Sequence, residues 1–155
     1  MIQRVMFVCL GNICRSPLAR ALFAKHADAH GIAEYFHIDS AGTSGNHTGE
    51  NADIRTLQNA RKNGLIFNHA AKQFTPEHLE AFDLIVVMDR SNERSVQSLC
   101  TKENQLTKIH LMRKWDTEAQ ELDVPDPWYG DSEGFEEVFQ ILNRSTLALL
   151  KELKP

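Results

Sequence analysis

Residues 4–9 read Arg-Val-Met-Phe-Val-Cys, and residues 10–17 continue Leu-Gly-Asn-Ile-Cys-Arg-Ser-Pro. After its initial arginine, the first stretch is a continuous apolar run with β-branched and aromatic side chains, which is typical of a strand buried on both faces. In the second stretch, Ser16 and Pro17 fit the N-cap and the first position of a helix. The sequence therefore predicts a buried strand, a short loop and a helix that runs to about His30.

The rest of the chain alternates between the same two kinds of element. Apolar runs predict strands at residues 36–39, 83–88 and 108–112. Capping residues predict one helix that starts at Asp53 or Thr56 and another that starts at Ser91. Helical periodicity predicts a long helix over residues 133–153. Continuous apolar strands between helices indicate a parallel sheet covered on both faces. We therefore expect an α/β fold in which residues 1–155 form a single doubly wound domain, with a short parallel sheet of about four strands.

The composition argues against several classes of protein. The chain has 155 residues, 42% of them hydrophobic and 25% charged, as in ordinary soluble domains. A net charge of -4 argues against a nucleic-acid partner. No apolar stretch has the length of a membrane span or the pattern of a signal peptide. An odd number of cysteines is a poor disulfide framework, so we expect a cytoplasmic protein without membrane insertion and with free thiols.

The loop after the first strand has the features of an anion-binding site. In doubly wound sheets, ligands bind at the carboxyl ends of the strands, where this loop lies. Gly11 and Asn12 tolerate the left-handed backbone conformations that let successive N–H groups point inward, and a helix N-terminus adds further unpaired N–H groups. The predicted phosphate-binding loop consists of Leu10, Gly11, Asn12, Ile13, Cys14, Arg15 and Ser16.

Cys9, directly before this loop, and Arg15, within it, predict nucleophilic chemistry on a phosphate. The field of the loop favours the thiolate form of Cys9, and Arg15 offers a planar fork of donors that matches two phosphate oxygens. Alone, a Cys-x5-Arg pattern also fits a core cysteine followed by a surface arginine. The preceding strand, the Gly-Asn pair and the following Ser-Pro helix start favour the functional interpretation. A nucleotide-binding loop is not indicated, since its Gly-Lys-Ser/Thr ending is absent.

At this point the sequence resembles the low-molecular-weight protein tyrosine phosphatases. The resemblance rests on residues 8–17 and, in family order, on 39–43, 68–69, 87–89 and 126–130. It implies hydrolysis of an aryl phosphate monoester through a phosphocysteine intermediate, with no cofactor and no metal. It also implies a phosphotyrosine-containing protein as substrate, a tyrosine kinase being one candidate. We expect a monomer or a weak dimer, and the sequence leaves this open.

Asp126 is the candidate general acid. A phenol leaves poorly as an anion near neutral pH, so a positioned carboxylic acid accelerates the reaction. Asp126 lies between Pro125 and Pro127, which stiffen its loop. An Asp-Pro pair that only begins a turn is the alternative. The resemblance to the acid loop of the family favours the catalytic role, in which the same carboxylate later acts as the base for water.

The resemblance also implies supporting residues around the loop. Ser16 is expected to donate a hydrogen bond to the Cys9 thiolate, in addition to any role as an N-cap. Asp89 either orients Arg15 or caps the following helix. The residues expected to hold the loop in shape by hydrogen bonds are Asn12, Ser40 and His69.

The walls of the substrate cleft are expected at Asn46, Trp128 and Tyr129, and Tyr129 is also a candidate phosphorylation site. Three positions depart from the family pattern. Asn46 replaces a common Trp, Trp128 replaces a common Tyr, and Arg20 replaces a common Glu near His69. These departures leave the substrate preference and the charge state of His69 open.

The resemblance gives Cys14 a redox role: in the family, this second loop cysteine forms a reversible disulfide with the nucleophile, which shelters it from over-oxidation. A small loop-filling residue is the alternative. A zinc site is not indicated, because there is no Cys-x2-Cys pair and the histidines are scattered.

Three other functions compete with tyrosine phosphatase activity. An arsenate reductase on this fold needs a further redox cysteine pair, and only Cys100 lies outside the loop. The protein-arginine phosphatases that resemble this loop carry Thr at the place of the apolar Ile13. A non-catalytic phosphoprotein-binding module would be expected to lose Cys9, Arg15 or Asp126, and the chain has all of them.

Overall fold

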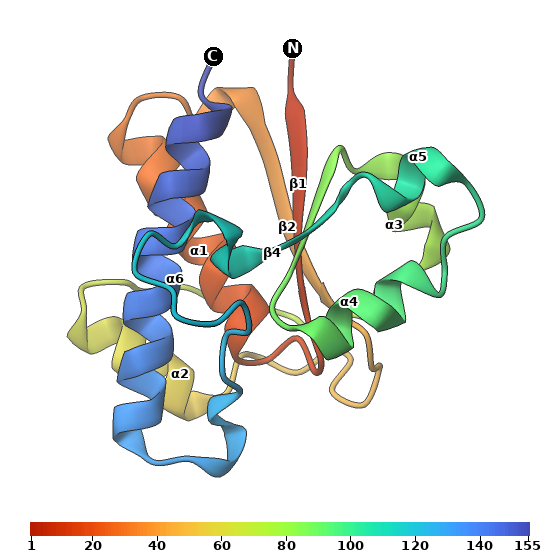
Figure 1. Ribbon diagram of the computed structural model, residues 1–155. Coiled ribbons are helices and arrows are strands. Elements are labelled where there is room, and N and C mark those ends of the chain that lie inside the picture. The colour runs from red at the N-terminus through yellow and green to blue at the C-terminus, as the bar shows by residue number, and fades with distance from the viewer.

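A four-stranded parallel sheet forms the centre of the molecule (Figure 1). The computed structural model describes residues 1–155, apart from the side chain of Tyr129. The strands follow the spatial order β2-β1-β3-β4, with all neighbours parallel; they are β1 (Gln3–Cys9), β2 (Phe36–Gly42), β3 (Leu84–Val87) and β4 (Ile109–Leu111). The predicted α/β fold with a short parallel sheet is therefore confirmed.

Helices cover both faces of the sheet. In Figure 1, α1, α2 and α6 lie on one side, and α3, α4 and α5 lie on the other. The α-helices are α1 (Arg15–Ala29), α2 (Ile54–Lys62), α3 (Pro76–Ala81), α4 (Arg90–Gln97), α5 (Glu103–Leu106) and α6 (Ser132–Leu153). Three short 3-10 helices are η1 (Ala33–Tyr35), η2 (Met112–Trp115) and η3 (Pro127–Tyr129). Among the described residues, no helix is long and apolar enough to span a membrane.

The alternation of side chains along β1 explains why this strand is apolar throughout. Val5 and Phe7 pack with apolar residues of α1 and α6, whereas Met6 and Val8 pack into the cluster that includes residues of α3 and α4. All four side chains are fully buried. A central strand of this kind contributes to two cores at once, so it shows no polar face.

Two predicted helix starts are wrong. The helix α1 begins at Arg15, and its N-cap position is Cys14, not Ser16. The Ser16 hydroxyl instead contacts the side chains of Cys9 and Asn12. The N-cap of α4 is Asp89, not Ser91. The backbone of Asp89 is still extended, and its carboxylate accepts a hydrogen bond from the N–H of Asn92 at 2.7 Å.

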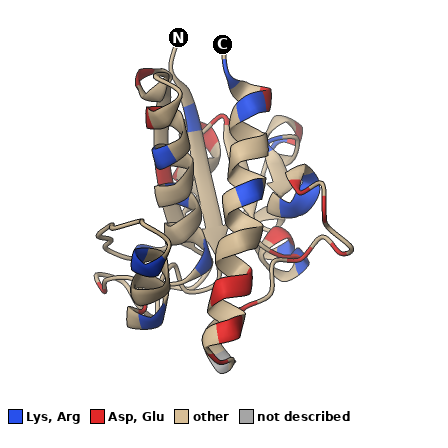
Figure 2. Cartoon of the chain, turned by 90° about the vertical axis from the view of Figure 1, so that its left-hand side faces the viewer, with Lys and Arg blue, Asp and Glu red and all other residues tan. Residues whose placement is uncertain are grey.

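The predicted start of α2 at Asp53 is confirmed, since the Asp53 side chain accepts a hydrogen bond from the N–H of Arg55. The long helix α6 begins directly after residues 123–131. Figure 2 shows acidic residues on its first turns and basic residues further along, an arrangement that complements the helix dipole. The acidic N-terminal turns therefore help to fix the point at which the loop before α6 ends.

The carboxyl ends of β1 and β2 approach each other closely. A Cβ atom placed on Gly42, the last residue of β2, would lie 2.7 Å from the carbonyl oxygen of Leu10 and 3.0 Å from the nitrogen of Asn12. Only glycine fits between these backbone atoms. The end of β2 therefore supports the loop that follows β1.

Candidate active site

Backbone hydrogen bonds fix the loop between β1 and α1 from several sides. The carbonyl groups of Cys9 and Leu10 each accept at 2.9 Å from the N–H groups of Thr43 and Ser44. The carbonyl of Ile13 accepts at 2.8 Å from the N–H of Asp53, which caps α2. The loop is thus tied to the segments that follow β2 and precede α2.

Asn12 organises the interior of the loop. It is the one described residue other than glycine with a positive φ, at 58°. Its side-chain NH2 group donates to the hydroxyls of Ser16 at 2.8 Å and Ser40 at 3.0 Å. Its side-chain oxygen accepts from the backbone N–H of Lys72 at 3.0 Å. An asparagine tolerates this conformation better than most residues, and here its side chain is fully hydrogen-bonded.

His69 completes the support of Asn12. Its Nε2 lies 2.8 Å from the backbone oxygen and 3.0 Å from the side-chain oxygen of Asn12. Because both partners are acceptors, Nε2 carries the proton. Burial is the main cause that lowers the pKa of His69, and the nearby positive charge of Arg20 adds to it. The structure therefore brings together Asn12, Ser40 and His69, and it favours a neutral His69.

Gly11 differs from expectation, because it does not share the positive φ of Asn12. A Cβ atom on Gly11 would lie 3.1 Å from the ring of His47. This glycine therefore leaves room for a side chain beside the loop and does not supply a left-handed turn.

Cys9 and Ser16 form a buried pair. The Sγ of Cys9 lies 3.0 Å from the Oγ of Ser16, and their residues are 2% and 0% exposed. Since Asn12 already donates to the Ser16 oxygen, the hydroxyl proton is free to point at sulfur. A second acceptor, the carbonyl of Ala41, lies further away at 3.4 Å. The arrangement suits a hydrogen bond from Ser16 to a Cys9 thiolate.

Arg15 is buried among groups of negative charge. One terminal nitrogen donates to the carboxylate of Asp89 at 2.8 Å and to the carbonyl of Val124 at 2.9 Å. The other lies 3.6 Å from the carboxylate of Asp126. Burial acts to lower the pKa of Arg15, but the charges of Cys9, Asp89 and Asp126 outweigh it and raise the pKa. Arg15 therefore stays charged.

Asp89 fills both of the roles that the sequence left open. One carboxylate oxygen accepts from Arg15, and the other caps α4. Its position at the N-cap thus fixes the direction in which Arg15 points.

Asp126 lies in the loop that the sequence predicted around Pro125 and Pro127, directly before the short helix η3. Its carboxylate accepts from the N–H of Trp128 at 3.1 Å, and its side chain is 37% exposed. The carboxylate thus combines a fixed backbone partner with access to solvent.

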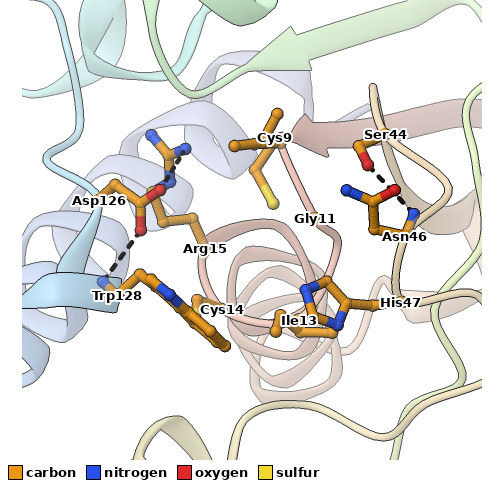
Figure 3. Close-up of a pocket in the computed structure, with 11 residues that line it drawn as sticks. Cys9, Gly11, Ile13, Cys14, Arg15, Ser44, Asn46, His47, Asp126 and Trp128 are labelled. Carbon is orange, nitrogen blue, oxygen red and sulfur yellow. Dashed lines mark hydrogen bonds and ion pairs between the residues drawn. The ribbon is translucent and has the colours of Figure 1, made fainter.

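A cavity of about 230 Å³ connects these groups. Figure 3 shows Asp126 and Trp128 on one side, Ser44, Asn46 and His47 on the opposite side, and Cys9 between them. Residues of the loop, including Ile13, Cys14 and Arg15, also line the cavity. Cys9, Arg15, Asp126, Asn46 and Trp128 therefore meet in one place. The side chain of Tyr129 lies outside the described part of the chain.

Sequence reasoning missed His47 at this cavity. Its ring centroid lies 5.7 Å from that of Trp128, and its Nδ1 lies 3.0 Å from the carboxylate of Glu50. Ser44, which also lines the cavity, was missed as well. Both residues lie in a turn-rich segment without any periodic pattern, and only their closeness to Asn46 pointed to them.

Cys14 is a buried free thiol in the same loop. Burial is the main cause that raises its pKa to about 12. The Cys14 thiol therefore remains protonated at neutral pH. Among the described residues, no three His, Cys, Asp or Glu side chains form a group that could hold a metal ion.

Comparisons with known proteins place this chain in one family. The family model for low molecular weight phosphotyrosine protein phosphatases matches residues 4–155. A low molecular weight protein-tyrosine-phosphatase of Streptomyces coelicolor is 39% identical over 99% of this chain and 95% of its own length. The low molecular weight phosphotyrosine protein phosphatase of Homo sapiens is 40% identical over 97% of this chain and 95% of its own.

The same likeness extends to solved structures. A protein tyrosine phosphatase from Entamoeba histolytica, crystallised with Hepes in its active site, superposes with a TM-score of 0.94 at 34% identity. The match covers 98% of this chain and 97% of the other. The protein belongs to the low molecular weight phosphotyrosine protein phosphatase family.

Proposed function

We propose that the protein, a protein tyrosine phosphatase, hydrolyses phosphotyrosine in protein substrates through a phosphocysteine at Cys9. The observation that carries this proposal is that Cys9, Arg15 and Asp126 line one cavity. A nucleophile, a phosphate-binding cation and a proton donor are then all within reach of one phosphate ester.

In the first step, the Cys9 thiolate attacks phosphorus, and the bond from phosphorus to the phenolic oxygen breaks. The protonated Asp126 gives its proton to that oxygen, so that a neutral phenol leaves. Arg15 and the backbone N–H groups of the loop bind the remaining phosphate oxygens. The rigid hold of Asp89 on Arg15 supports this role.

In the second step, a water molecule attacks the phosphorus of phosphocysteine. The Asp126 carboxylate accepts a proton from this water, and the bond from phosphorus to sulfur breaks. Cys9 leaves as a thiolate, which the hydrogen bond from Ser16 stabilises. Inorganic phosphate departs, and Asp126 is again protonated for the next cycle.

The lining of the cavity supports an aromatic substrate. Ile13 and Trp128 offer apolar surface beside the groups that bind the phosphate. A phosphotyrosine ring reaches the bottom of such a cavity more readily than the shorter phosphoserine. The apolar Ile13 offers no polar contact to a guanidinium, which argues against phosphoarginine.

The other two candidate functions have less support. Cys100 is half-buried three residues after the end of α4 and does not line the cavity, so a relay for arsenate reduction lacks a partner thiol there. A module that only binds phosphoproteins would not need Asp126 beside Arg15.

We also propose the cytoplasm as the compartment and a phosphotyrosine protein, with a tyrosine kinase as one candidate, as the partner. All cysteines are free in the structure, and the proposed chemistry requires a reduced Cys9.

Phosphate release from phosphotyrosine, phosphoserine and phosphoarginine peptides, with EDTA present, tests the proposal. We expect release from phosphotyrosine alone, its abolition by Cys9→Ser and a strong decrease with Asp126→Ala. Cys100→Ser removes a thiol away from the cavity and should retain activity. A preference for phosphoarginine would contradict the substrate assignment, and no release from any peptide would contradict catalysis.

A further inference from the structure

Arg55, in the first turn of α2, connects two loops of the active site. Its guanidinium pairs with the Asp53 carboxylate through two hydrogen bonds of 3.0 Å, from Nε and from a terminal nitrogen. The remaining terminal nitrogen donates at 3.1 Å to the carbonyl of Trp128. The guanidinium also lies over the rings of Trp128 and Phe135, with its carbon 5.3 Å and 4.7 Å from their centroids.

Asp53 attaches this arginine to the phosphate-binding loop. Its N–H donates to the carbonyl of Ile13 at 2.8 Å. Its side chain is only 9% exposed. Burial opposes ionisation of Asp53, but hydrogen bonds from the side chain and backbone of Arg55 outweigh it and lower the pKa of the carboxyl group. The pair is therefore ionised, and Asp53 links Arg55 to the phosphate-binding loop.

The segment that carries Asp126 is thereby held on both sides of this residue. Arg15 binds the carbonyl of Val124, and Arg55 binds the carbonyl of Trp128. Val124 is buried, and its N–H also donates to the carbonyl of Met88 at 2.8 Å. Trp128 is 37% exposed and therefore less held by packing than Val124. The contacts of Arg55 are thus the main restraint on the segment after Asp126.

We propose that Arg55 is a positioning residue that sets where the Asp126 carboxyl group meets the leaving oxygen of the substrate. This inference rests on the proposed role of Asp126 as the general acid. Arg55 acts through the backbone of Trp128, whose N–H binds the Asp126 carboxylate. A displacement of about 1 Å at such a group can cost on the order of 100-fold in rate.

Aryl phosphates with different leaving groups test this role. Phenyl phosphate releases a phenol with a pKa near that of tyrosine, about 10, so it depends on the acid, whereas the more acidic 4-nitrophenol depends on it less. Arg55→Met keeps an unbranched side chain over the aromatic rings but removes the donors. We expect Arg55→Met to lower kcat/KM for phenyl phosphate by about 10- to 100-fold and that for 4-nitrophenyl phosphate by much less.

Two further variants make the result specific. Arg55→Lys keeps the charge without the fork, and we expect it to restore the rate only in part. Arg61→Met removes an exposed arginine from the same helix and should match wild type with both substrates. Thermal unfolding of each variant, followed by circular dichroism, checks that every variant is folded at the temperature of the kinetic assay.

A double-mutant cycle with Asp126→Asn decides between outcomes. If Arg55 acts through Asp126, Arg55→Met should cost little more in the Asp126→Asn background. An equal loss with both substrates, or full additivity with Asp126→Asn, would overturn the inference while the proposed function stands. If Asp126→Asn lowered kcat/KM equally for phenyl phosphate and 4-nitrophenyl phosphate, the general-acid assignment would fail, and this inference with it.

Discussion

The Oγ of Ser16 lies 3.0 Å from the Sγ of Cys9, and Asn12 donates to this same oxygen at 2.8 Å. Asn12 thereby leaves the Ser16 hydroxyl proton available to the sulfur. The hydroxyl would stabilise Cys9 as an attacking thiolate and again as a leaving thiolate. The family resemblance predicted a contact between Ser16 and Cys9, whereas the local pattern assigned Ser16 to a helix cap; the structure has the contact and places the N-cap at Cys14.

Ser16→Ala should lower kcat for phosphotyrosine peptides by about 100-fold, as the loss of one preorganised donor does in other enzymes. Steady-state kinetics measures this effect. Ser145→Ala is the matched control, because Ser145 is buried in α6 and its hydroxyl has no hydrogen-bond partner among the described residues. Wild-type kcat in Ser16→Ala would contradict the role of this hydroxyl.

Substitutions of Asn12 should separate backbone strain from lost hydrogen bonds. Asn12→Gly keeps the left-handed backbone and removes the side chain, whereas Asn12→Ala also adds steric strain of about 1 kcal/mol. We expect both variants to lose about 2 kcal/mol or more in the free energy of unfolding, because buried partners become unsatisfied. Urea unfolding should give Asn12→Ala a lower free energy of unfolding than Asn12→Gly, and the reverse order would argue against strain at this position.

His69 should make the folded state sensitive to mild acid. Its pKa is lowered on folding, chiefly by burial, so the unfolded chain takes up the proton first as the pH falls. The stabilising contribution is complete above the unfolded pKa of about 6.5 and is lost as the pH falls below it. As the pH falls below this value, urea unfolding should show a smaller decrease in the free energy of unfolding for His69→Gln than for wild type. Identical pH profiles would contradict the prediction.

The state of Cys14 leads to a prediction about oxidation. If a disulfide with Cys9 protects the nucleophile, as the family resemblance implies, peroxide followed by a thiol reductant should restore activity in wild type and not in Cys14→Ser. Because the pKa of Cys14 is raised to about 12, the closure of the disulfide should accelerate with pH as the thiolate fraction grows. Equal recovery in both proteins would assign Cys14 to loop filling.

The central fold could be predicted from the sequence because its signals are local. The apolar run 4–9 and the periodic pattern of 133–153 each depend on neighbouring residues alone. The short helices α3 and α5 were missed, since four to six residues are too few for a periodic pattern. The caps of α1 and α4 were misassigned because several polar residues compete for each helix start.

The candidate site was predictable where a motif carries the chemistry. Cys9 and Arg15 share one loop, but nothing local places Asp126 beside them, and the family resemblance supplied that pairing. His47 and Arg55 were missed because each contacts Trp128, which is far away in the sequence. Such contacts exist only once the sheet has brought the loops together.

Detection of the covalent intermediate tests the central claim most directly. The wild-type enzyme is mixed rapidly with phenyl phosphate, quenched in acid within one turnover and digested for mass spectrometry. Our account predicts one phosphoryl group on the peptide that contains Cys9, and none on that peptide in Cys9→Ala, which has no atom that could accept it. Turnover without any phosphopeptide at Cys9, or a phosphoryl group on another side chain, would contradict it.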